Sequence, residues 1–184
     1  MIESNKKYQI IYADPPWGIN VRKGTSNKLR PSHYSRMSIK DIAGLQIPQI
    51  ADINCALFLW VTMPALNRAF EVIETWGFRY STVAFTWVKL NKNNMGLFTG
   101  CGWWTRANAE LCLLGIKGSL KRVSRSVPQI IASPIMNHSR KPDEIVRDRI
   151  IALLGDLPRV EIFSRRKVEG WDCWGNEVDS DIEL

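Results

Sequence analysis

The sequence predicts an α/β domain built on a sheet that contains parallel strands, and two observations favour this fold class. Six short runs rich in apolar, β-branched and aromatic residues have the composition of buried strands. Two segments between these runs have the three- and four-residue spacing of amphipathic helices. Strands separated by helices of this length are typical of a sheet with parallel neighbours. The predicted strands are Tyr8–Ala13, Ala56–Val61, Ser81–Leu90, Glu110–Ile116, Pro128–Ala132 and Arg159–Phe163.

Both predicted helices have a defined beginning or end. The first covers Pro64–Trp76 and is followed by Gly77, a frequent helix stop. The second covers Pro142–Leu154, starts with proline and two acidic residues that suit the positive end of a helix, and is followed by Gly155. The apolar face of the first helix is predicted to contain Leu66, Ala69, Phe70, Ile73 and Trp76. That of the second is predicted to contain Ile145, Arg149 through its alkyl stem, Ile150, Leu153 and Leu154.

The chain is expected to form a single domain over residues 1–184. Its length is ample for a hydrophobic core, and it contains no internal repeat, low-complexity tract or Pro/Ser-rich linker. Three stretches, near residues 18–35, 91–109 and 117–126, are long for simple connections. Long ordered loops are often functional, so we expect these three to contact a substrate.

Composition and charge narrow the class of function. A hydrophobic content of 45% with 23% charged residues excludes a disordered or collagen-like chain. The net charge is +7, and basic residues crowd two of the long loops. Basic loops beside a base-binding site can contact phosphates. We expect these to lie near Asp14, where as a group they favour a nucleic acid as partner, although any one of them is more simply a solvated surface charge. They are Arg22, Lys23, Lys28, Arg30, Lys117, Lys121, Arg122 and Arg125.

No segment of the sequence predicts a membrane or metal protein. The longest apolar run, Cys55–Val61, is too short to cross a bilayer, and residues 1–7 lack the apolar core of a signal peptide. We therefore expect a cytoplasmic protein without membrane contact. The four cysteines are widely separated, and only His33 and His138 could join them, so we expect free thiols and no metal site.

The segment Asp14-Pro15-Pro16-Trp17 directly follows the first predicted strand. Residues before proline favour extended backbone, and ligands of open α/β sheets bind beyond the carboxyl ends of strands. The segment therefore offers a carboxylate, a backbone carbonyl and an indole face to a cleft. An exocyclic amino group on a nucleobase needs two acceptors of this kind and an aromatic ring to stack on its base. A proline-rich turn without a ligand is the simpler alternative.

Two acceptors have a chemical purpose at an aromatic amine. The lone pair of that nitrogen is delocalised into the ring, which makes it a poor nucleophile. Binding both hydrogens, by Asp14 and by the Pro15 carbonyl, favours a more tetrahedral nitrogen whose lone pair can attack a methyl group. The nearby carboxylate then stabilises the positive charge that develops during transfer, so Asp14 need not act first as a strong base.

The sequence resembles the MT-A70 family of S-adenosylmethionine-dependent N6-adenine methyltransferases, and in particular its small prokaryotic or phage members. The resemblance extends beyond the four-residue motif and runs in the family's order over about residues 8–177. The further matching blocks are Tyr34-Ser35-Arg36-Met37-Ser38, Leu57-Phe58-Leu59-Trp60-Val61-Thr62, Trp87-Val88-Lys89, Trp104-Thr105-Arg106-Ala107-Asn108-Ala109-Glu110, His138-Ser139-Arg140-Lys141-Pro142-Asp143-Glu144, Val160-Glu161-Ile162-Phe163-Ser164-Arg165 and Trp171-Asp172-Cys173-Trp174-Gly175-Asn176-Glu177.

The resemblance implies a Rossmann-like methyltransferase sheet flanked by helices, in which the catalytic motif precedes the cofactor motif along the chain. It implies that Asp14, Pro15, Pro16 and Trp17 hold the target adenine and orient its amino group. Tyr34 is implied to stack on or near that base, with a lid residue that touches no ligand as the alternative. The remaining residues implied to bind substrate are Arg106, Asn108 and Glu110.

For the cofactor, S-adenosylmethionine, the resemblance implies that Lys141 meets the methionine carboxylate; a solvated lysine is the simpler alternative. Glu161 is implied to lie near the ribose hydroxyls. Asn176, which could equally be a turn residue, is placed with the other implied ribose and adenine contacts, Phe163, Arg165 and Glu177. The chain lacks a Gly-x-Gly-x-x-Gly fingerprint, so this Glu-x-Phe-x-Arg stretch would take its place.

The main hypothesis is a DNA N6-adenine methyltransferase. RNA is the first alternative substrate, because the chemistry is the same and only the backbone contacts differ. A non-catalytic nucleic-acid-binding subunit is the second alternative, which the intact Asp-Pro-Pro-Trp motif disfavours. A cytosine amino-methyltransferase is the third, although related cytosine motifs more often end in tyrosine. A homodimer or a partner subunit is compatible with so small a chain.

Overall fold

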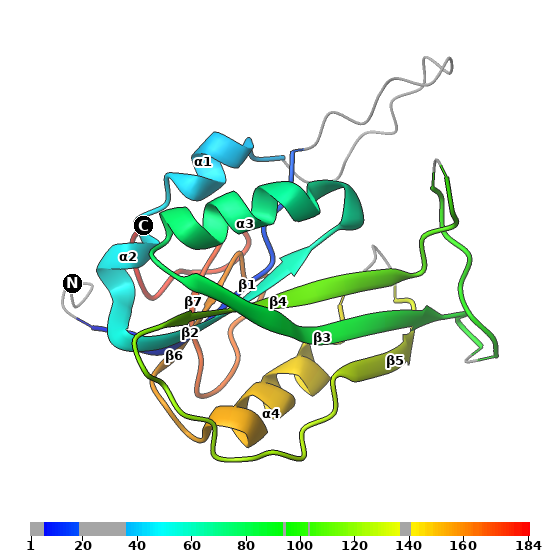
Figure 1. The fold of residues 1–184 in the computed structure, drawn as a ribbon. Coiled ribbons are helices and arrows are strands. Elements are labelled where there is room, and N and C mark those ends of the chain that lie inside the picture. Colours follow the sequence, from blue (N-terminus) through cyan, green and yellow to red (C-terminus); the bar gives the residue numbers. More distant parts are fainter. Residues whose placement is uncertain (1–5, 19–35, 94, 103, 137–140) are drawn as a thin grey trace.

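The computed structural model of the chain describes residues 6–18, 36–93, 95–102, 104–136 and 141–184. Within them, a seven-stranded sheet has the order β5-β3-β4-β2-β1-β6-β7. Helices cover both faces of the sheet: α1, α2 and α3 lie on one side and α4 on the other (Figure 1). The predicted α/β sheet flanked by helices is therefore confirmed.

All six predicted strands are present, with small shifts at their ends. A seventh, β7, was not predicted, because three residues are too few for a pattern of alternation. The observed strands are β1 (Tyr8–Ala13), β2 (Ala51–Val61), β3 (Arg79–Leu90), β4 (Ala109–Lys117), β5 (Ile130–Pro134), β6 (Arg159–Ile162) and β7 (Asp172–Trp174). The expected parallel pairs are β1 with β2 and β6, β6 with β7, and β3 with β5, whereas β4 runs antiparallel to both its neighbours.

Both predicted helices are also confirmed. The first begins with a 3-10 turn, η1 (Met63–Ala65), and continues as α3 (Leu66–Thr75); the second is α4 (Asp143–Leu154), with Pro142 at its N-cap. Two further helices, α1 (Ile39–Ala43) and α2 (Ile47–Ile50), were not predicted because neither completes two turns.

The predicted apolar face of α4 needs a correction. Ile145 is 41% exposed, whereas Val146 and Arg147 point inward and are buried. Arg147 can be buried because its guanidinium group meets the carboxylate of Glu161 on β6. Arg149 is half-buried as expected, but its guanidinium group also donates hydrogen bonds to the carbonyls of Pro128 and Ile130, at 2.7 and 2.8 Å, beside strand β5.

Two hydrophobic cores lie on opposite faces of the sheet, because successive strand residues point to opposite sides. One core lies under α1, α2 and α3, and the other lies under α4. β1 shows the alternation directly: Ile11 and Ala13 enter the first core, and Ile10 and Tyr12 enter the second. Each large side chain buried in this way stabilises the fold by about 1.5–3 kcal/mol.

The strand directions determine where the candidate site lies. β1, β2, β6 and β7 are parallel, so their last residues share one side of the sheet, here named the carboxyl edge. β4 is antiparallel, and its residue Leu111 pairs with Val61 at the end of β2, so β4 begins at this same edge. The end of β3 lies there too, since Val88 pairs with Ala109. No helix in the described part of the chain is long and apolar enough to cross a membrane.

Candidate active site

The Asp14-Pro15-Pro16-Trp17 motif leaves β1 at the carboxyl edge and is fastened to both neighbouring strands. The backbone N–H of Asp14 donates to the carbonyl of Ile162 at the end of β6, at 3.5 Å. The indole Nε1 of Trp17 donates to the carbonyl of Trp60 near the end of β2, at 2.9 Å. These contacts fix the motif across the ends of three parallel strands.

Four charged side chains from four segments meet beside this motif. The Nζ atom of Lys141, just before α4, lies 2.7 Å from each carboxylate oxygen of Asp14. The same Nζ atom lies 3.2 Å from Oε2 of Glu110 at the start of β4. The other oxygen of Glu110 pairs with Lys89 near the end of β3. Three of these side chains are almost fully buried, but that of Asp14 is 33% exposed and is the member that a ligand can reach.

The two lysines determine the ionisation of the group. Burial alone would raise the pKa of Glu110, but the charges of Lys141 and Lys89 outweigh it and hold that pKa below its usual value. Burial alone would lower the pKa of Lys141, but Asp14 and Glu110 raise it overall. Burial raises the pKa of Asp14, and Lys141 opposes the rise. The lysine charges therefore favour the ionised form of Glu110, whereas burial and Lys141 act in opposite directions on Asp14.

One acceptor of the motif can still receive a hydrogen bond. The Pro15 carbonyl accepts one from the N–H of Trp17 at 2.9 Å, and a carbonyl oxygen has a second lone pair. Oε2 of Glu110, by contrast, is buried and is compensated by the ammonium group of Lys141 at 3.2 Å. The acceptors open to a ligand are therefore the Asp14 carboxylate and the Pro15 carbonyl.

A second pair of buried charges lies on the other side of Asp14. The carboxylate of Glu161 on β6 accepts a hydrogen bond from Nη1 of Arg147 at 2.8 Å. Arg147 is 4% exposed, and its Nη2 atom has no partner among the described residues. Burial raises the pKa of Glu161 to about 7; Arg147 opposes the rise, and Asp143 and Asp14 add to it.

The turns that follow β6 and β7 lie side by side. The N–H of Ser164 donates to the carbonyl of Trp174 at 2.9 Å. A Cβ atom on Gly175 would lie 2.1 Å from the Ser164 carbonyl oxygen, so only glycine allows this approach. Phe163 adopts a positive φ of 67° and packs its ring against Trp174, with the ring centroids 5.5 Å apart. Strained backbone of this kind is often found at ligand sites.

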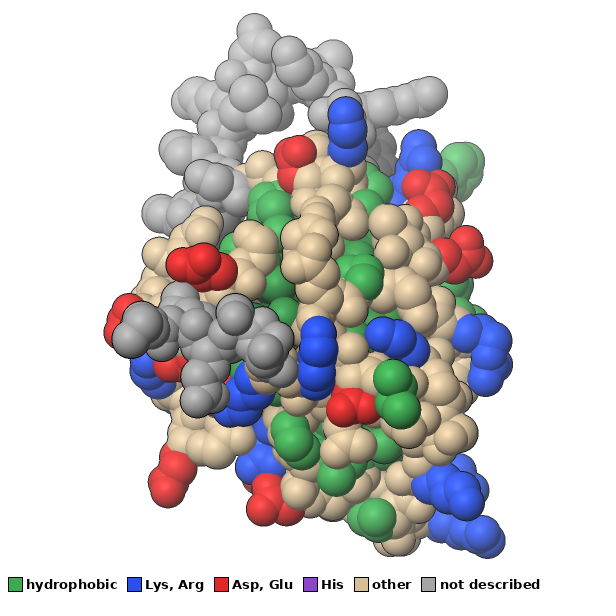
Figure 2. All heavy atoms as spheres, turned by 90° about the vertical axis from the view of Figure 1, so that its left-hand side faces the viewer, with side chains coloured by type: hydrophobic (Ala, Val, Ile, Leu, Met, Phe, Trp, Pro, Cys, Tyr) green, Lys and Arg blue, Asp and Glu red, His purple; other side chains and the backbone are tan. Residues whose placement is uncertain are grey.

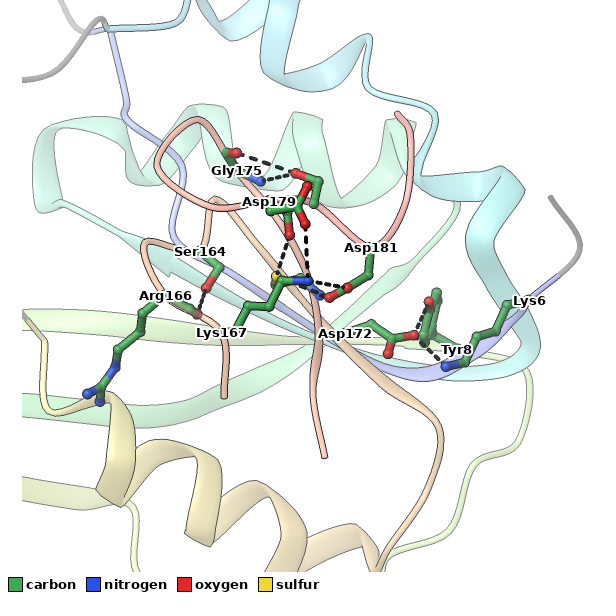
Figure 3. A network of polar contacts seen from close by, with 11 residues as sticks. Lys6, Tyr8, Ser164, Arg166, Lys167, Asp172, Gly175, Asp179 and Asp181 are labelled. Atoms are coloured by element: carbon green, nitrogen blue, oxygen red, sulfur yellow. Dashed lines mark hydrogen bonds and ion pairs between the residues drawn. The ribbon is translucent and has the colours of Figure 1, made fainter. Parts of the chain in front are cut away.

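Polar contacts hold the turn after β7 in place, as Figure 3 shows. Asp181 accepts a hydrogen bond from the Cys173 backbone N–H at 3.0 Å and pairs with Lys167 at 2.7 Å. Lys167 also lies 3.8 Å from Asp179. Burial raises the pKa of the Cys173 thiol to about 11, so the thiol is protonated at neutral pH. Asn176 and Glu177 lie in this turn with exposed side chains.

The sequence-predicted residues divide into three groups. Asp14, Glu110 and Lys141 are in direct contact, and Trp17 is fixed beside them. Of the implied cofactor residues, Glu161, Phe163, Arg165, Asn176 and Glu177 follow or end β6 and β7 at the same edge. Arg106 is exposed in the loop between β3 and β4, and the backbone carbonyl of Asn108 accepts a hydrogen bond from Lys89 at 2.8 Å. Tyr34 lies outside the described residues.

One prediction about the basic loops is wrong. Lys117, Lys121, Arg122 and Arg125 were expected near Asp14, but Lys117 pairs with Cys55 at the opposite edge of the sheet. The reason is that β4 is antiparallel, so the chain leaves it far from the carboxyl edge. Figure 2 views the molecule from the left-hand side of Figure 1, and on this face basic side chains are interspersed with acidic ones. The other basic group, at residues 22–30, lies outside the described residues.

Sequence reasoning did not assign a role to three residues of the site. Lys89 lies within the matching block Trp87-Val88-Lys89, and a lysine directly after an apolar pair near the end of a strand could have identified it. Arg147 was missed because the predicted apolar face of α4 did not include it. Tyr12 has no sequence signal, because it resembles any core residue; its hydroxyl donates to Asp143 at 2.7 Å and accepts from Trp60 Nε1 at 2.8 Å.

Known proteins match the chain over nearly its whole length. A family model described as MT-A70 matches residues 8–177. The type II methyltransferase M.MunI of Mycoplasma sp is 32% identical over 198 residues, covering 97% of this chain and 82% of that protein. The N(6)-adenosine-methyltransferase catalytic subunit METTL3 of Homo sapiens is 30% identical over 177 residues, covering 94% of this chain and 28% of that protein. A putative N(6)-adenosine-methyltransferase of Medicago truncatula is 33% identical, and the chain spans 26% of it.

Proposed function

The chain belongs to the MT-A70 family of S-adenosylmethionine-dependent adenine methyltransferases, and from this premise we propose that it methylates the exocyclic amino group of adenine in DNA. The observation that carries the proposal is the meeting of Asp14, Lys141 and Glu110 at the carboxyl edge, next to the paired turns after β6 and β7. This edge is where open α/β sheets bind their ligands.

The residues at this edge fit S-adenosylmethionine. The methionine carboxylate needs a cation, which Lys141 offers, and ribose hydroxyls need an acceptor, which Glu161 offers. Asn176 and Glu177 add exposed polar groups in the turn that Gly175 brings close to Ser164. When bound, S-adenosylmethionine supplies a methyl group on a sulfonium centre.

On the substrate side, Asp14 and the Pro15 carbonyl accept the two amino hydrogens of adenine, and Trp17 provides an aromatic wall. The carboxylate of Asp14 stabilises the positive charge that develops on the nitrogen as the N–C bond forms and the bond from carbon to sulfur breaks. The surplus amino proton then leaves along the hydrogen bond to Asp14 and passes to solvent.

Lys141 cannot hold Asp14 in this way throughout the reaction. Its ammonium group contacts both carboxylate oxygens, so at least one must be released before an amino hydrogen can bind. A ligand carboxylate at Lys141 competes for the same ammonium group. We therefore expect Lys141 to turn from Asp14 when such a ligand binds, so that adenine binds more tightly to protein that already holds the cofactor.

DNA is preferred to RNA because of how much of each relative the chain covers. It spans 82% of a type II methyltransferase but only 28% of an N(6)-adenosine-methyltransferase subunit. We expect residues 91–109 and the stretch near residues 18–35 to contact the nucleic acid, Tyr34, Arg106 and Asn108 among them, and we expect the protein to act in the cytoplasm. A homodimer or a partner subunit would enlarge the surface available to a duplex.

The test is methyl transfer from a labelled donor to matched DNA and RNA oligonucleotides, single- and double-stranded, followed by mass spectrometry of the nucleosides. The proposal predicts N6-methyldeoxyadenosine. N6-methyladenosine from RNA alone would replace DNA by RNA as the substrate. Donor binding without any product would indicate a missing partner subunit, and the absence of donor binding would contradict the enzymatic assignment.

A further inference from the structure

The loop between β3 and β4, residues 91–108, forms an arm that projects beyond the sheet at the carboxyl edge (Figure 1). Its backbone is hydrogen-bonded across the arm: Phe98 N–H donates to the Lys89 carbonyl at 2.8 Å, and Gly100 N–H donates to the Ala107 carbonyl at 3.0 Å. A Cβ atom on Gly102 would lie 1.9 Å from the carbonyl oxygen of Thr105. The described residues on the two sides of the arm are therefore closely paired as far as Gly102 and Thr105, next to Trp104.

The arm exposes large apolar side chains that contribute nothing to either core. Trp104 is 99% exposed, Met95 is 71% exposed and Leu97 is 56% exposed. A tryptophan left in water forgoes the large stabilisation that its burial would give, and apolar groups gathered at an exposed site often mark an interaction surface. A flat ring held away from the protein is also the shape on which a nucleobase stacks.

The positive charge of the arm favours a nucleic acid as its partner. Residues 91–109 include Lys92 and Arg106 and no aspartate or glutamate. A cationic segment with an exposed aromatic ring matches a single-stranded or unstacked nucleic acid, whose bases stack while its phosphates pair with the cations. Two copies of this arm would repel each other, so the charge disfavours a second copy of the chain as the occupant.

The arm is continuous with the candidate site. Lys89, immediately before it, pairs with Glu110, immediately after it, and Glu110 faces Lys141 beside Asp14. Both roots of the arm therefore belong to the group of charges that would receive the target adenine. We therefore expect nucleotides next to an adenine at Asp14 to come within reach of the arm.

We propose that Trp104 stacks on a nucleobase near the target adenine, so that the arm holds the substrate strand while the adenine lies at Asp14. This role rests on the proposed function, because it needs a nucleic-acid substrate. Removing one stacking partner of this kind weakens binding by roughly 5- to 150-fold. The loss should be sequence-tolerant, because every base has a face on which a ring can stack.

The experiment compares Trp104→Ala, Trp104→Phe and Ile53→Ala with the wild-type chain. Binding is measured by fluorescence anisotropy with labelled single-stranded and duplex oligonucleotides, and kcat and KM are measured for methyl transfer. Trp104→Ala should weaken nucleic-acid binding and raise KM within the stated range. Trp104→Phe should stay within about threefold of wild type because it keeps a ring. Ile53→Ala should equal wild type, because Ile53 is 78% exposed near the start of β2, away from the carboxyl edge.

Two further readings separate this role from folding and from self-association. S-adenosylmethionine affinity, measured by calorimetry, should be unchanged in Trp104→Ala if the site is intact. A change of oligomeric state in sedimentation that accompanies the loss in Trp104→Ala and is absent from Ile53→Ala would identify a second copy as the occupant and overturn the proposal. If Trp104→Ala methylates DNA with the wild-type KM, the stacking role of Trp104 is overturned and the proposed function stands. If the wild-type chain binds no nucleic acid, both proposals are overturned.

Discussion

Two groups of buried charges lie next to Asp14, and each contains a buried carboxylate whose pKa is shifted in a different direction. On the substrate side, Glu110 faces Lys141 and Lys89, and its pKa is held below the usual value in spite of burial. On the cofactor side, Glu161 faces only Arg147 while Asp143 and Asp14 lie nearby, and burial raises its pKa to about 7. The balance of opposite and like charges therefore decides whether a buried carboxylate stays ionised.

This difference has a functional meaning. On the substrate side, Lys141 and Lys89 favour the ionised form of Glu110. On the cofactor side, Glu161 titrates near neutral pH, so one of its acceptors for a ribose hydroxyl would be lost as the pH falls below about 7. Substitutions in each of the two groups test this difference.

Lys141→Met is expected to have the largest effect on stability. The substitution keeps an unbranched side chain, shorter by one atom, but removes the ammonium group that Asp14 and Glu110 share. Breaking a buried ion pair from one side is unfavourable by about 3–5 kcal/mol. The free energy of unfolding, measured with urea and tryptophan fluorescence, should fall by this order. Lys141→Arg is the matched control, because it keeps the charge, and equal stability of Lys141→Met and wild type would contradict the shared role.

Asp14→Ala should act on the rate more than on the fold. Its carboxylate is the exposed member of the group, and Lys141 still has Glu110 as partner when it is removed. Loss of one group that stabilises developing charge lowers kcat by about 10²- to 10³-fold. Single-turnover methyl transfer measures this, with Asp156→Asn as the control because Asp156 is 86% exposed and lies in an unrelated ion pair. Full activity of Asp14→Ala would remove Asp14 from the proposed chemistry.

The sequence could identify several residues of this site but not the contacts between them. Asp14 was predictable because prolines fix the backbone after a recognisable strand, and Lys141 and Glu110 lie in matching blocks. Their mutual contact was not predictable, because it depends on β4 running antiparallel, which local periodicity does not report. The same strand direction carries Lys117 away from the site, contrary to expectation. Arg147 was missed because its burial depends on a partner on another element.

Glu161 should make both stability and cofactor affinity depend on pH. Its pKa in the folded chain, about 7, lies above its unfolded value, so the folded state holds this proton more tightly. Its contribution to stability is therefore fully present at acid pH and is lost as the pH rises through about 7, by at most about 3 kcal/mol. Glu161→Gln should remove this slope from urea denaturation measured between pH 5 and 8, whereas Glu177→Gln, in the exposed turn, should keep it.

Cofactor affinity should respond in the opposite direction. Only the ionised carboxylate of Glu161 accepts from both of its oxygens, so S-adenosylmethionine should bind more tightly as the pH rises through about 7. Calorimetric titrations across this range should show the rise in wild type and a flat profile in Glu161→Gln. A flat wild-type profile would separate Glu161 from the ribose.

Arg147→Met gives the smallest expected change in cofactor affinity and the most specific one, because it changes Glu161 without touching the ligand. Arg147 opposes the rise in the pKa of Glu161, so its removal should move the midpoint of cofactor affinity above 7. At pH 7 the affinity should fall several-fold and should recover in more alkaline buffer. A merely structural loss would lower the affinity at every pH, so recovery separates the two explanations. Arg149→Met, on the same helix but bonded to backbone carbonyls near β5, should leave the midpoint unchanged.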